Sequence, residues 1–406
     1  MKEILIITFL IIHGFVSPLL GQCDEERAHP YFKRSVYEFS VDLLTRAAQE
    51  KENHFVTSTF SIWAALACAS LGAADKTLTE FKDVLKLHNR KCFNNQYLTI
   101  ASKVTINDDT DIDIQKSSSI FVDDRFLIRD EFKYKLESTG LSSIIDMAFD
   151  DADIAAQKIN DYVIRATHNT IDGVVAPSDI ENAVMIIIDS IFFKGSWQKS
   201  FNSAETGLIK FYNDRGIALG DVNMMVTSDM FRVGSVPLLN AQVLELPYGN
   251  KTENRYSMLI FLPEEGVSLY NVIDNLKKVS LTSINFLLEQ FGEQRATVQL
   301  PRFKISSDLS NLKELLADMG LGSMFGPSAR FPFISDLPIY VSNFIQKASI
   351  EVNEEGSTAS AVTKAEFTLR SNSITFFARK PFLYMIVDKK YQIPLFAGAY
   401  SKPSVY

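Results

Sequence analysis

The sequence predicts a mixed α/β fold, with helices concentrated in the first half of the chain and strands in the second. Apolar residues recur at helical spacing in residues 61–71 and 78–85, whereas residues 184–193 form a continuous apolar run typical of a buried strand. The 406 residues contain no linker rich in proline, glycine and serine, no repeat and no low-complexity tract. One large domain covering residues 22–406 is therefore favoured over two or three.

Three helices can be placed from local signals. Residues 61–71 are an apolar helical stretch. Thr77 and Glu80 have the spacing of an N-terminal capping box, and an amphipathic helical pattern follows them. Residues 312–319 repeat the helical pattern and stop at Gly320, as expected at a helix C-terminus.

The isoleucine-rich run at residues 184–193 predicts a central strand that is covered on both faces. Asp189 interrupts this run, and an unpaired buried carboxylate would cost several kcal/mol or stay protonated. A hydrogen-bond partner for Asp189 is therefore expected. Shorter runs predict four further strands, at residues 242–247, 256–262, 382–387 and 394–399.

Composition excludes several classes of function. With 46% hydrophobic and 22% charged residues, the chain can bury a large core. The net charge of −8 disfavours a nucleic-acid partner. His88, Arg90 and Lys91 form only a short basic cluster, which is interpreted as a solvated face rather than a polyanion site.

The N-terminus has the layout of a secretory signal peptide. Lys2 precedes an apolar run at residues 4–12, and small Gly21 provides the preferred cleavage site, so residues 1–21 are predicted to be removed. The run is too short to span a bilayer. The sequence thus predicts a soluble, secreted, extracellular protein without a membrane partner.

The segment from Glu354 to Ser371 carries two patterns at once. Two acids, a glycine and a run of small residues are typical of an exposed loop. The same residues alternate as in a strand, with small or apolar side chains at Ser357, Ala359 and Ala361 and mostly polar side chains on the other face. This combination indicates a segment that switches between a loop and a buried strand.

Six motifs, in the order in which serpins have them, make the chain resemble that family. One is the acid-acid-glycine sequence at residues 354–356, and the other five lie at residues 192–197, 244–248, 357–361, 377–382 and 395–398. The resemblance extends from about Tyr31 to Pro403. It implies three β-sheets, about nine helices and an exposed reactive loop near the C-terminus, at about residues 354–375.

The resemblance assigns roles within this loop. Arg370 stands fourteen residues after Gly356, where serpins place the residue that enters the protease specificity pocket, so Arg370-Ser371 is the expected reactive bond. Arginine there suits trypsin-like proteases. The residues expected to contact the protease are Phe367, Thr368 and Leu369. The expected hinge consists of Glu355, Gly356, Ser357, Thr358, Ala359, Ser360 and Ala361.

The resemblance also implies a region that controls opening of the central sheet, at Ser58, Ser61, Asp189 and Gln346. Serpins usually have asparagine at the position of Asp189, histidine at that of Gln346 and proline at that of Thr59. The substituted residues at the first two positions still form hydrogen bonds, so the sheet-opening role is retained. The alternative is a buried polar pair with a purely structural role.

Two covalent modifications are expected. Cys23, Cys68 and Cys92 remain after processing, and their odd number leaves one unpaired. Cys68 lies in an apolar helical stretch and is interpreted as a buried hydrophobe. Some serpins tie the N-terminus to the body, which makes Cys23 and Cys92 the candidate pair, although sequence alone does not fix connectivity. Asn250 begins the Asn-Lys-Thr acceptor for glycosylation.

Nothing in the sequence resembles a catalytic or metal site, and no cofactor is expected. The histidines of the mature chain lack ligand spacing and are interpreted as surface or satisfied residues; they are His29, His54, His88 and His168. The leading hypothesis is a monomeric suicide inhibitor of a trypsin-like serine protease in a clotting or innate-immune cascade, with a glycosaminoglycan as a candidate further partner. The alternative is a non-inhibitory serpin that acts as a binding or carrier protein.

Overall fold

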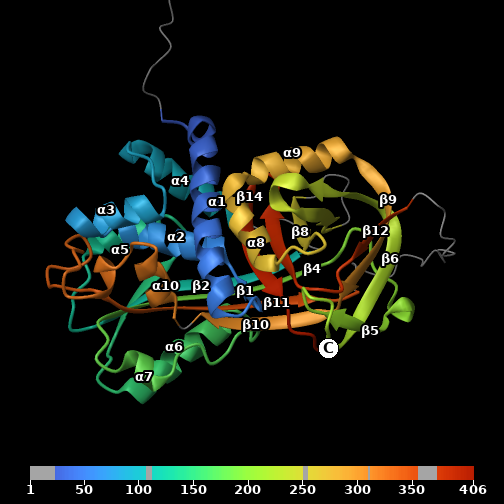
Figure 1. The fold of residues 1–406 in the computed structure, drawn as a ribbon. Helices are drawn as coiled ribbons and strands as arrows, with labels where there is room; N and C mark the ends of the chain where they lie inside the picture. Colours follow the sequence, from blue (N-terminus) through green and yellow to red (C-terminus); the bar gives the residue numbers. More distant parts are fainter. Residues whose placement is uncertain (1–22, 107–111, 250–254, 310, 355–372) are drawn as a thin grey trace, which may run out of the picture.

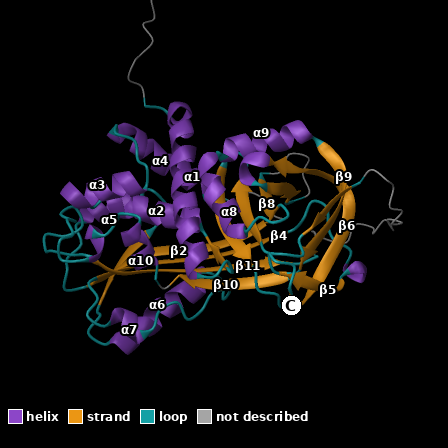
Figure 2. Cartoon of the chain, viewed as in Figure 1, coloured by secondary structure: helices purple, strands orange, loops and turns teal. Residues whose placement is uncertain are grey.

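The computed structural model describes residues 23–106, 112–249, 255–309, 311–354 and 373–406. These residues form two β-sheets. Most helices lie on one side of the molecule, whereas the helices at residues 269–275 and 281–291 lie beside the strands of one sheet (Figure 1). Figure 2 distinguishes the helices from the strands by colour. The predicted mixed α/β fold is confirmed.

Ten α-helices occur in the described residues, where about nine were expected. They are α1 (Glu25–Glu50), α2 (Thr59–Ser70), α3 (Asp75–Val84), α4 (Lys91–Val104), α5 (Asp130–Glu137), α6 (Ala152–Ala166), α7 (Pro177–Ile180), α8 (Leu269–Asn275), α9 (Leu281–Phe291) and α10 (Leu312–Asp318). The predicted apolar helix corresponds to α2, and the helix expected to stop at Gly320 corresponds to α10. Gly320 has a φ of 106°, which a residue without a β-carbon adopts readily.

The capping box predicted at Thr77 is wrong. Helix α3 begins at Asp75, so Thr77 lies inside its first turn. The Thr77 hydroxyl accepts hydrogen bonds from the Ser323 hydroxyl at 3.0 Å and the Arg330 backbone N–H at 3.1 Å. Glu80 accepts from the Ser323 N–H at 2.8 Å. These two side chains are therefore used to attach a distant loop instead of capping their own helix.

A five-stranded sheet has the strand order β10-β11-β4-β2-β3. Its strands are β2 (Ile112–Asp123), β3 (Ser143–Met147), β4 (Met185–Gly195), β10 (Phe303–Leu309) and β11 (Val341–Val352). The central neighbours β4 and β11 run parallel, whereas β2 and β10 pair with them antiparallel. Parallel pairing is slightly less stable per residue than antiparallel pairing.

Strand β4 is covered on both faces, as its sequence predicts. Ile187 belongs to the core formed with α2, whereas Ile186 and Ile188 pack in a separate cluster with α6. Figure 1 shows α2 and α6 on opposite sides of this sheet. Successive residues of a strand point to opposite faces, so both faces require apolar side chains.

The second sheet has nine strands, in the order β1-β14-β13-β8-β7-β6-β9-β12, with β5 paired to β6. The strands are β1 (Phe55–Thr57), β5 (Gly207–Tyr212), β6 (Ala218–Val236), β7 (Ala241–Pro247), β8 (Tyr256–Pro263), β9 (Glu293–Pro301), β12 (Ile374–Phe377), β13 (Phe382–Asp388) and β14 (Ile393–Tyr400). β6 is 19 residues long and pairs with β5, β7 and β9. This strand joins two of the three expected sheets into one.

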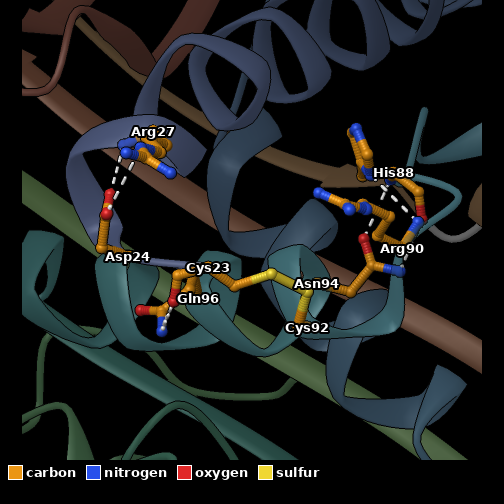
Figure 3. The surroundings of a disulfide bond; sticks show 8 residues. All are labelled: Cys23, Asp24, Arg27, His88, Arg90, Cys92, Asn94 and Gln96. Carbon is orange, nitrogen blue, oxygen red and sulfur yellow. Dashed lines mark hydrogen bonds and ion pairs between the residues drawn. A yellow bond between two sulfur atoms is a disulfide. The ribbon is translucent and has the colours of Figure 1, made fainter. Parts of the chain in front are cut away.

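A disulfide joins Cys23 to Cys92, with Cα atoms 5.9 Å apart (Figure 3). It links the residue before the N-cap of α1 to the first turn of α4. Gln96 adds a hydrogen bond from its Nε2 to the Cys23 carbonyl oxygen at 3.0 Å. Cys68 is free and buried, and burial raises the pKa of its thiol to about 12. The structure thus places Cys68 as the sequence predicts.

Candidate functional site

The predicted reactive loop connects the two sheets. β11 precedes it in the centre of the five-stranded sheet, and β12 follows it at the edge of the nine-stranded sheet, where it pairs parallel with β9. The hinge, the protease-contacting residues and the Arg370-Ser371 bond all fall within 355–372, outside the described residues. Asn250 also lies outside them.

The residues just before the loop are held by side chains of other elements. Glu354 is buried and accepts a hydrogen bond from the Thr206 hydroxyl at 2.6 Å, and it lies 3.5 Å from the Arg302 guanidinium. Trp197 donates from its indole nitrogen to the Asn353 carbonyl oxygen at 2.8 Å and stacks on Tyr248. The first acid of the predicted loop is therefore an anchor at the end of β11.

The four residues assigned to sheet opening come together in one buried polar cluster. Asp189 of β4 and Gln346 of β11 are direct neighbours in the parallel ladder. The Gln346 side-chain nitrogen donates to Asp189 Oδ2 at 2.6 Å, and the Ser61 hydroxyl donates to Oδ1. Ser58 caps α2 by accepting from the Ser61 N–H at 3.2 Å. Asp189 thus has two hydrogen-bond donors, Gln346 and Ser61, where at least one partner was expected.

The orientation of the Gln346 amide is fixed by the backbone of Ser58. The Ser58 N–H donates to Gln346 Oε1 at 3.1 Å, and the Thr57 hydroxyl donates to the same oxygen at 2.6 Å. A backbone N–H can only donate, so Oε1 must face it and Nε2 must face Asp189. The group at position 189 must consequently accept a hydrogen bond from Gln346, which a carboxylate does without rearrangement.

Burial disfavours the charged forms of Asp189 and of the nearby Lys116. Loss of water raises the pKa of Asp189 to about 6, although the hydrogen bonds from Ser61 and Gln346 and the charge of Lys116 oppose this rise. Burial also lowers the pKa of the Lys116 ammonium to about 8, with Asp189 acting in the opposite direction. Asp189 and Lys116 therefore stabilise each other's charged forms in a site that disfavours both.

Lys116 was not identified from the sequence. It lies in β2 on the same face of the strand as Ile112, Ile114 and Ile120. The side chains of these isoleucines pack in or against the main core. A lysine at an inward position of an otherwise apolar strand face is the signal that could have revealed it. Thr59, the third departure from the usual serpin pattern, is buried and pairs through its hydroxyl with Ser40 at 2.7 Å.

Histidines do not gather at any site within the described residues. His29 contacts the Tyr391 carbonyl oxygen at 3.0 Å, and His88 Nδ1 accepts from the Arg90 N–H at 3.0 Å (Figure 3). His54 accepts from the Ser401 and Lys402 N–H groups. In the part of the chain that the structure describes, no group of three His, Cys, Asp or Glu side chains is placed to hold a metal ion.

Comparison with known proteins identifies the family. The family model described as Serpin (serine protease inhibitor) matches residues 34–403. The chain is 30% identical over 383 residues to Intracellular coagulation inhibitor 2 of Tachypleus tridentatus, which covers 92% of this chain and 91% of that protein. Glia-derived nexin of Rattus norvegicus is 29% identical over 363 residues, covering 88% of this chain and 89% of the nexin.

Solved structures agree with this assignment. Uncleaved ovalbumin superposes with a TM-score of 0.81 at 25% identity, covering 92% of this chain and 100% of ovalbumin. Native protease nexin-1, solved with heparin, superposes with a TM-score of 0.80 at 24% identity, covering 93% of this chain and 100% of the nexin. The fold and the order of motifs define a serpin, and this chain belongs to the serpin family.

We predict that Asp189→Asn stabilises the native protein above about pH 6. An unfolded aspartate titrates near pH 3.9, so between about pH 4 and pH 6 the folded state retains a proton that the unfolded state has lost. The free energy of unfolding therefore falls as pH rises through this window. Asparagine carries no charge, accepts from Gln346 and donates to Ser61. Urea unfolding should show a gain of about 1–2 kcal/mol at pH 7.5, since one pKa unit corresponds to about 1.4 kcal/mol.

The difference between Asp189→Asn and the wild type should disappear below about pH 4, because the unfolded aspartate is then protonated as well. Asp161→Asn is the matched control, since Asp161 is exposed on α6; it should leave the pH dependence unchanged. A lower stability of Asp189→Asn than of the wild type at pH 7.5 would show that the carboxylate is net stabilising.

Proposed function

We propose that this serpin is a secreted, non-enzymatic inhibitor of a trypsin-like serine protease, which it traps after being cut at Arg370-Ser371. The observation that carries the proposal is the placement of the loop's two attachments. β11 lies beside its parallel neighbour β4 in one sheet, and β12 lies at the edge of the other. Cutting the segment between these two attachments leaves its first part joined only to β11, so that this part is free to change its position.

The chemistry is an ordinary acyl transfer that stops at the acyl-enzyme, before water hydrolyses the ester bond. The protease serine attacks the carbonyl carbon of Arg370, its ester bond to Arg370 forms, and the peptide bond breaks with the proton passing to the new amino group of Ser371. Ser371 remains joined to β12, whereas Arg370 and the attached protease remain joined to β11. A bidentate contact from the Arg370 guanidinium to a pocket carboxylate favours trypsin-like enzymes.

Insertion of the cut segment between β4 and β11 would then displace the protease. A strand that turns back from β11 is antiparallel to both neighbours, so one parallel pairing is replaced by two antiparallel pairings, which are slightly more stable. Fourteen residues at about 3.3 Å each correspond to a movement of about 45 Å. Ser357, Ala359 and Ala361 fit this role because they bring no bulk or charge to the buried face.

The polar cluster lies in the path of insertion. The Gln346–Asp189 contact joins the two strands that must separate, so breaking it contributes to the barrier that keeps the native form from inserting its own loop. We therefore assign Ser58, Ser61, Asp189 and Gln346 to control of sheet opening. The alternative, a purely structural polar cluster, predicts that changes in its hydrogen bonds alter stability without altering the rate of insertion.

A binding or carrier role without inhibition is the second candidate function. It requires a hinge that resists insertion, through bulky side chains, charges or proline. The hinge of this chain has Ser357, Ala359 and Ala361 instead. The sequence of the hinge therefore supports inhibition.

Secretion is supported by the disulfide as well as by the signal-like segment at residues 1–21, because disulfides persist mainly in oxidising compartments. Among the helices that the structure describes, none is both long and apolar enough to cross a membrane. Glycosylation at Asn250 belongs to the same proposal. The names of two similar proteins, a coagulation inhibitor and a nexin solved with heparin, support a cascade role and a glycosaminoglycan as a further partner.

Replacing Arg370 with alanine should abolish inhibition of trypsin, because the pocket carboxylate of the protease loses its charge partner. Loss of such a desolvated pair costs about 2–5 kcal/mol, or at least thirtyfold in the association step. The measurement is the second-order inhibition rate together with formation of a covalent complex that survives boiling in detergent. Lys364→Ala, which removes a cation from the same loop, should retain the wild-type rate. Wild-type inhibition by Arg370→Ala would place the reactive bond elsewhere.

Replacing Ser357 with arginine should convert the inhibitor into a substrate. Insertion would bury an unpaired charge, at a cost of several kcal/mol, whereas hydrolysis of the acyl-enzyme would proceed unhindered. The number of inhibitor molecules consumed per protease silenced should rise at least tenfold, with cleavage still at Arg370-Ser371. Thr358→Arg, on the opposite face of the alternation, is the matched control and should stay close to the wild type. An unchanged ratio for Ser357→Arg would exclude loop insertion.

A further inference from the structure

A cavity of about 310 Å³ lies among α2, α3, α4 and α5, away from the loop attachments and the polar cluster. This volume is at the lower end of the range for small-molecule sites. We call it the helical pocket. Neither the inhibitory mechanism nor the sheet-opening cluster uses it, so ligand binding there does not require the proposed inhibition.

The floor of the helical pocket is apolar. It includes Trp63, Ala67 and Phe132, all of which are buried. The indole N–H of Trp63 is already directed to the Ser35 hydroxyl at 3.1 Å and the Leu85 carbonyl oxygen at 3.3 Å. The floor therefore leaves no polar group to satisfy and favours the hydrocarbon part of a ligand.

The rim of the helical pocket is cationic. Lys82 of α3, Lys91 of α4 and Lys135 of α5 all line it. Within the part of the chain that the structure describes, none of the three forms an ion pair or donates a side-chain hydrogen bond. The pKa of Lys135 is lowered, first by burial of its ammonium group and then by the charge of Lys91. Two like charges thus lie near each other, and neither forms an ion pair within the described residues, although the chain as a whole carries −8.

Negative groups at the pocket do not neutralise this rim. Glu131 is the one carboxylate among the lining residues, against three lysines. Arg129 also lines the pocket, but its guanidinium forms an ion pair with Asp336. The three lysines therefore leave an excess of positive charge at the opening of an apolar cavity.

The pocket is held open by covalent and hydrogen-bonded structure. Lys91 immediately precedes Cys92, whose disulfide to Cys23 fixes the first turn of α4 (Figure 3). Asn94, which also lines the pocket, bonds through its amide to both the N–H and the carbonyl oxygen of His88, each at 2.9 Å. A pre-formed site lowers the entropic cost of binding.

We propose that the helical pocket binds a small amphipathic anion, with its apolar body on the Trp63 floor and its acidic group between Lys91 and Lys135. The ligand class is a medium-chain carboxylate of about ten to fifteen non-hydrogen atoms, as the cavity size indicates. Binding of a carboxylate would relieve the repulsion between the two lysines, so the charge and the apolar body both contribute to affinity.

The test is calorimetric titration of the mature protein with three probes of matched size. Octanoate has the apolar body and the charge, octanamide has the body alone, and octylammonium has the opposite charge. Octanoate should bind saturably at one site, octanamide at least tenfold more weakly, and octylammonium should not bind. Equal binding of octanoate and octanamide would overturn the proposal, because the lysine rim would then have no role.

Variants locate the site. Lys91→Ala combined with Lys135→Ala should weaken octanoate binding at least tenfold and leave octanamide unchanged. Ala67→Phe, which places a larger side chain at the floor of the pocket, should weaken the binding of both octanoate and octanamide. Lys103→Ala is the matched control on α4, because Lys103 pairs with Glu25 outside the pocket; it should bind octanoate as the wild type does. Normal octanoate binding by the double variant would overturn the proposal.

A sulfated polysaccharide provides the competing interpretation, since clustered lysines also attract polyanions. If the pocket is the site of a small anion, octanoate binding is saturable without polysaccharide and is lost in Ala67→Phe. A rim that binds the polysaccharide, with octanoate neither binding nor competing, would overturn the proposal. Circular dichroism and urea unfolding of each variant establish that it remains folded.

Discussion

The hydrogen bond between Gln346 and Asp189 is the interaction on which the rest of the structure depends. It crosses the parallel pair β4 and β11, where the five-stranded sheet has its weakest type of pairing. Gln346 also bonds Thr57 and both backbone groups of Ser58, and Ser61 reaches Asp189. One cluster thereby joins both central strands to the N-terminus of α2 and to β1 of the other sheet.

This cluster connects its strands through several hydrogen bonds, but the buried charge of Asp189 reduces its net contribution to stability. Every donor in it has an acceptor, so separating the strands exposes several polar groups at once and presents a high barrier. The buried Asp189 charge, however, works against the folded state at neutral pH, since burial raises its pKa to about 6. Under the proposed mechanism, the fold must persist and later rearrange, and a high barrier combined with modest stability suits both requirements.

The sequence predicts those features that depend on local pattern, and it fails where distant segments compete. The central strand follows from continuous isoleucine, and the need for a partner at Asp189 follows from burial alone. Thr77 satisfies a capping pattern, but its hydroxyl bonds Ser323 and Arg330, a tertiary contact that local spacing cannot reveal. Lys116 was missed for a related reason, because its role depends on Asp189 of a neighbouring strand.

Under the proposed mechanism, the anchor at Glu354 would limit where insertion begins. Its carboxylate is buried and held by Thr206 and Arg302, and the preceding Asn353 carbonyl is held by Trp197. Moving Glu354 into the sheet would require these contacts to break and would carry a charge into an apolar layer. Gly356, two residues later, is the first residue without a side chain, and it can reverse the chain at small cost. The turn is therefore expected between Glu354 and Ser357, which makes Ser357 the first side chain to enter the sheet.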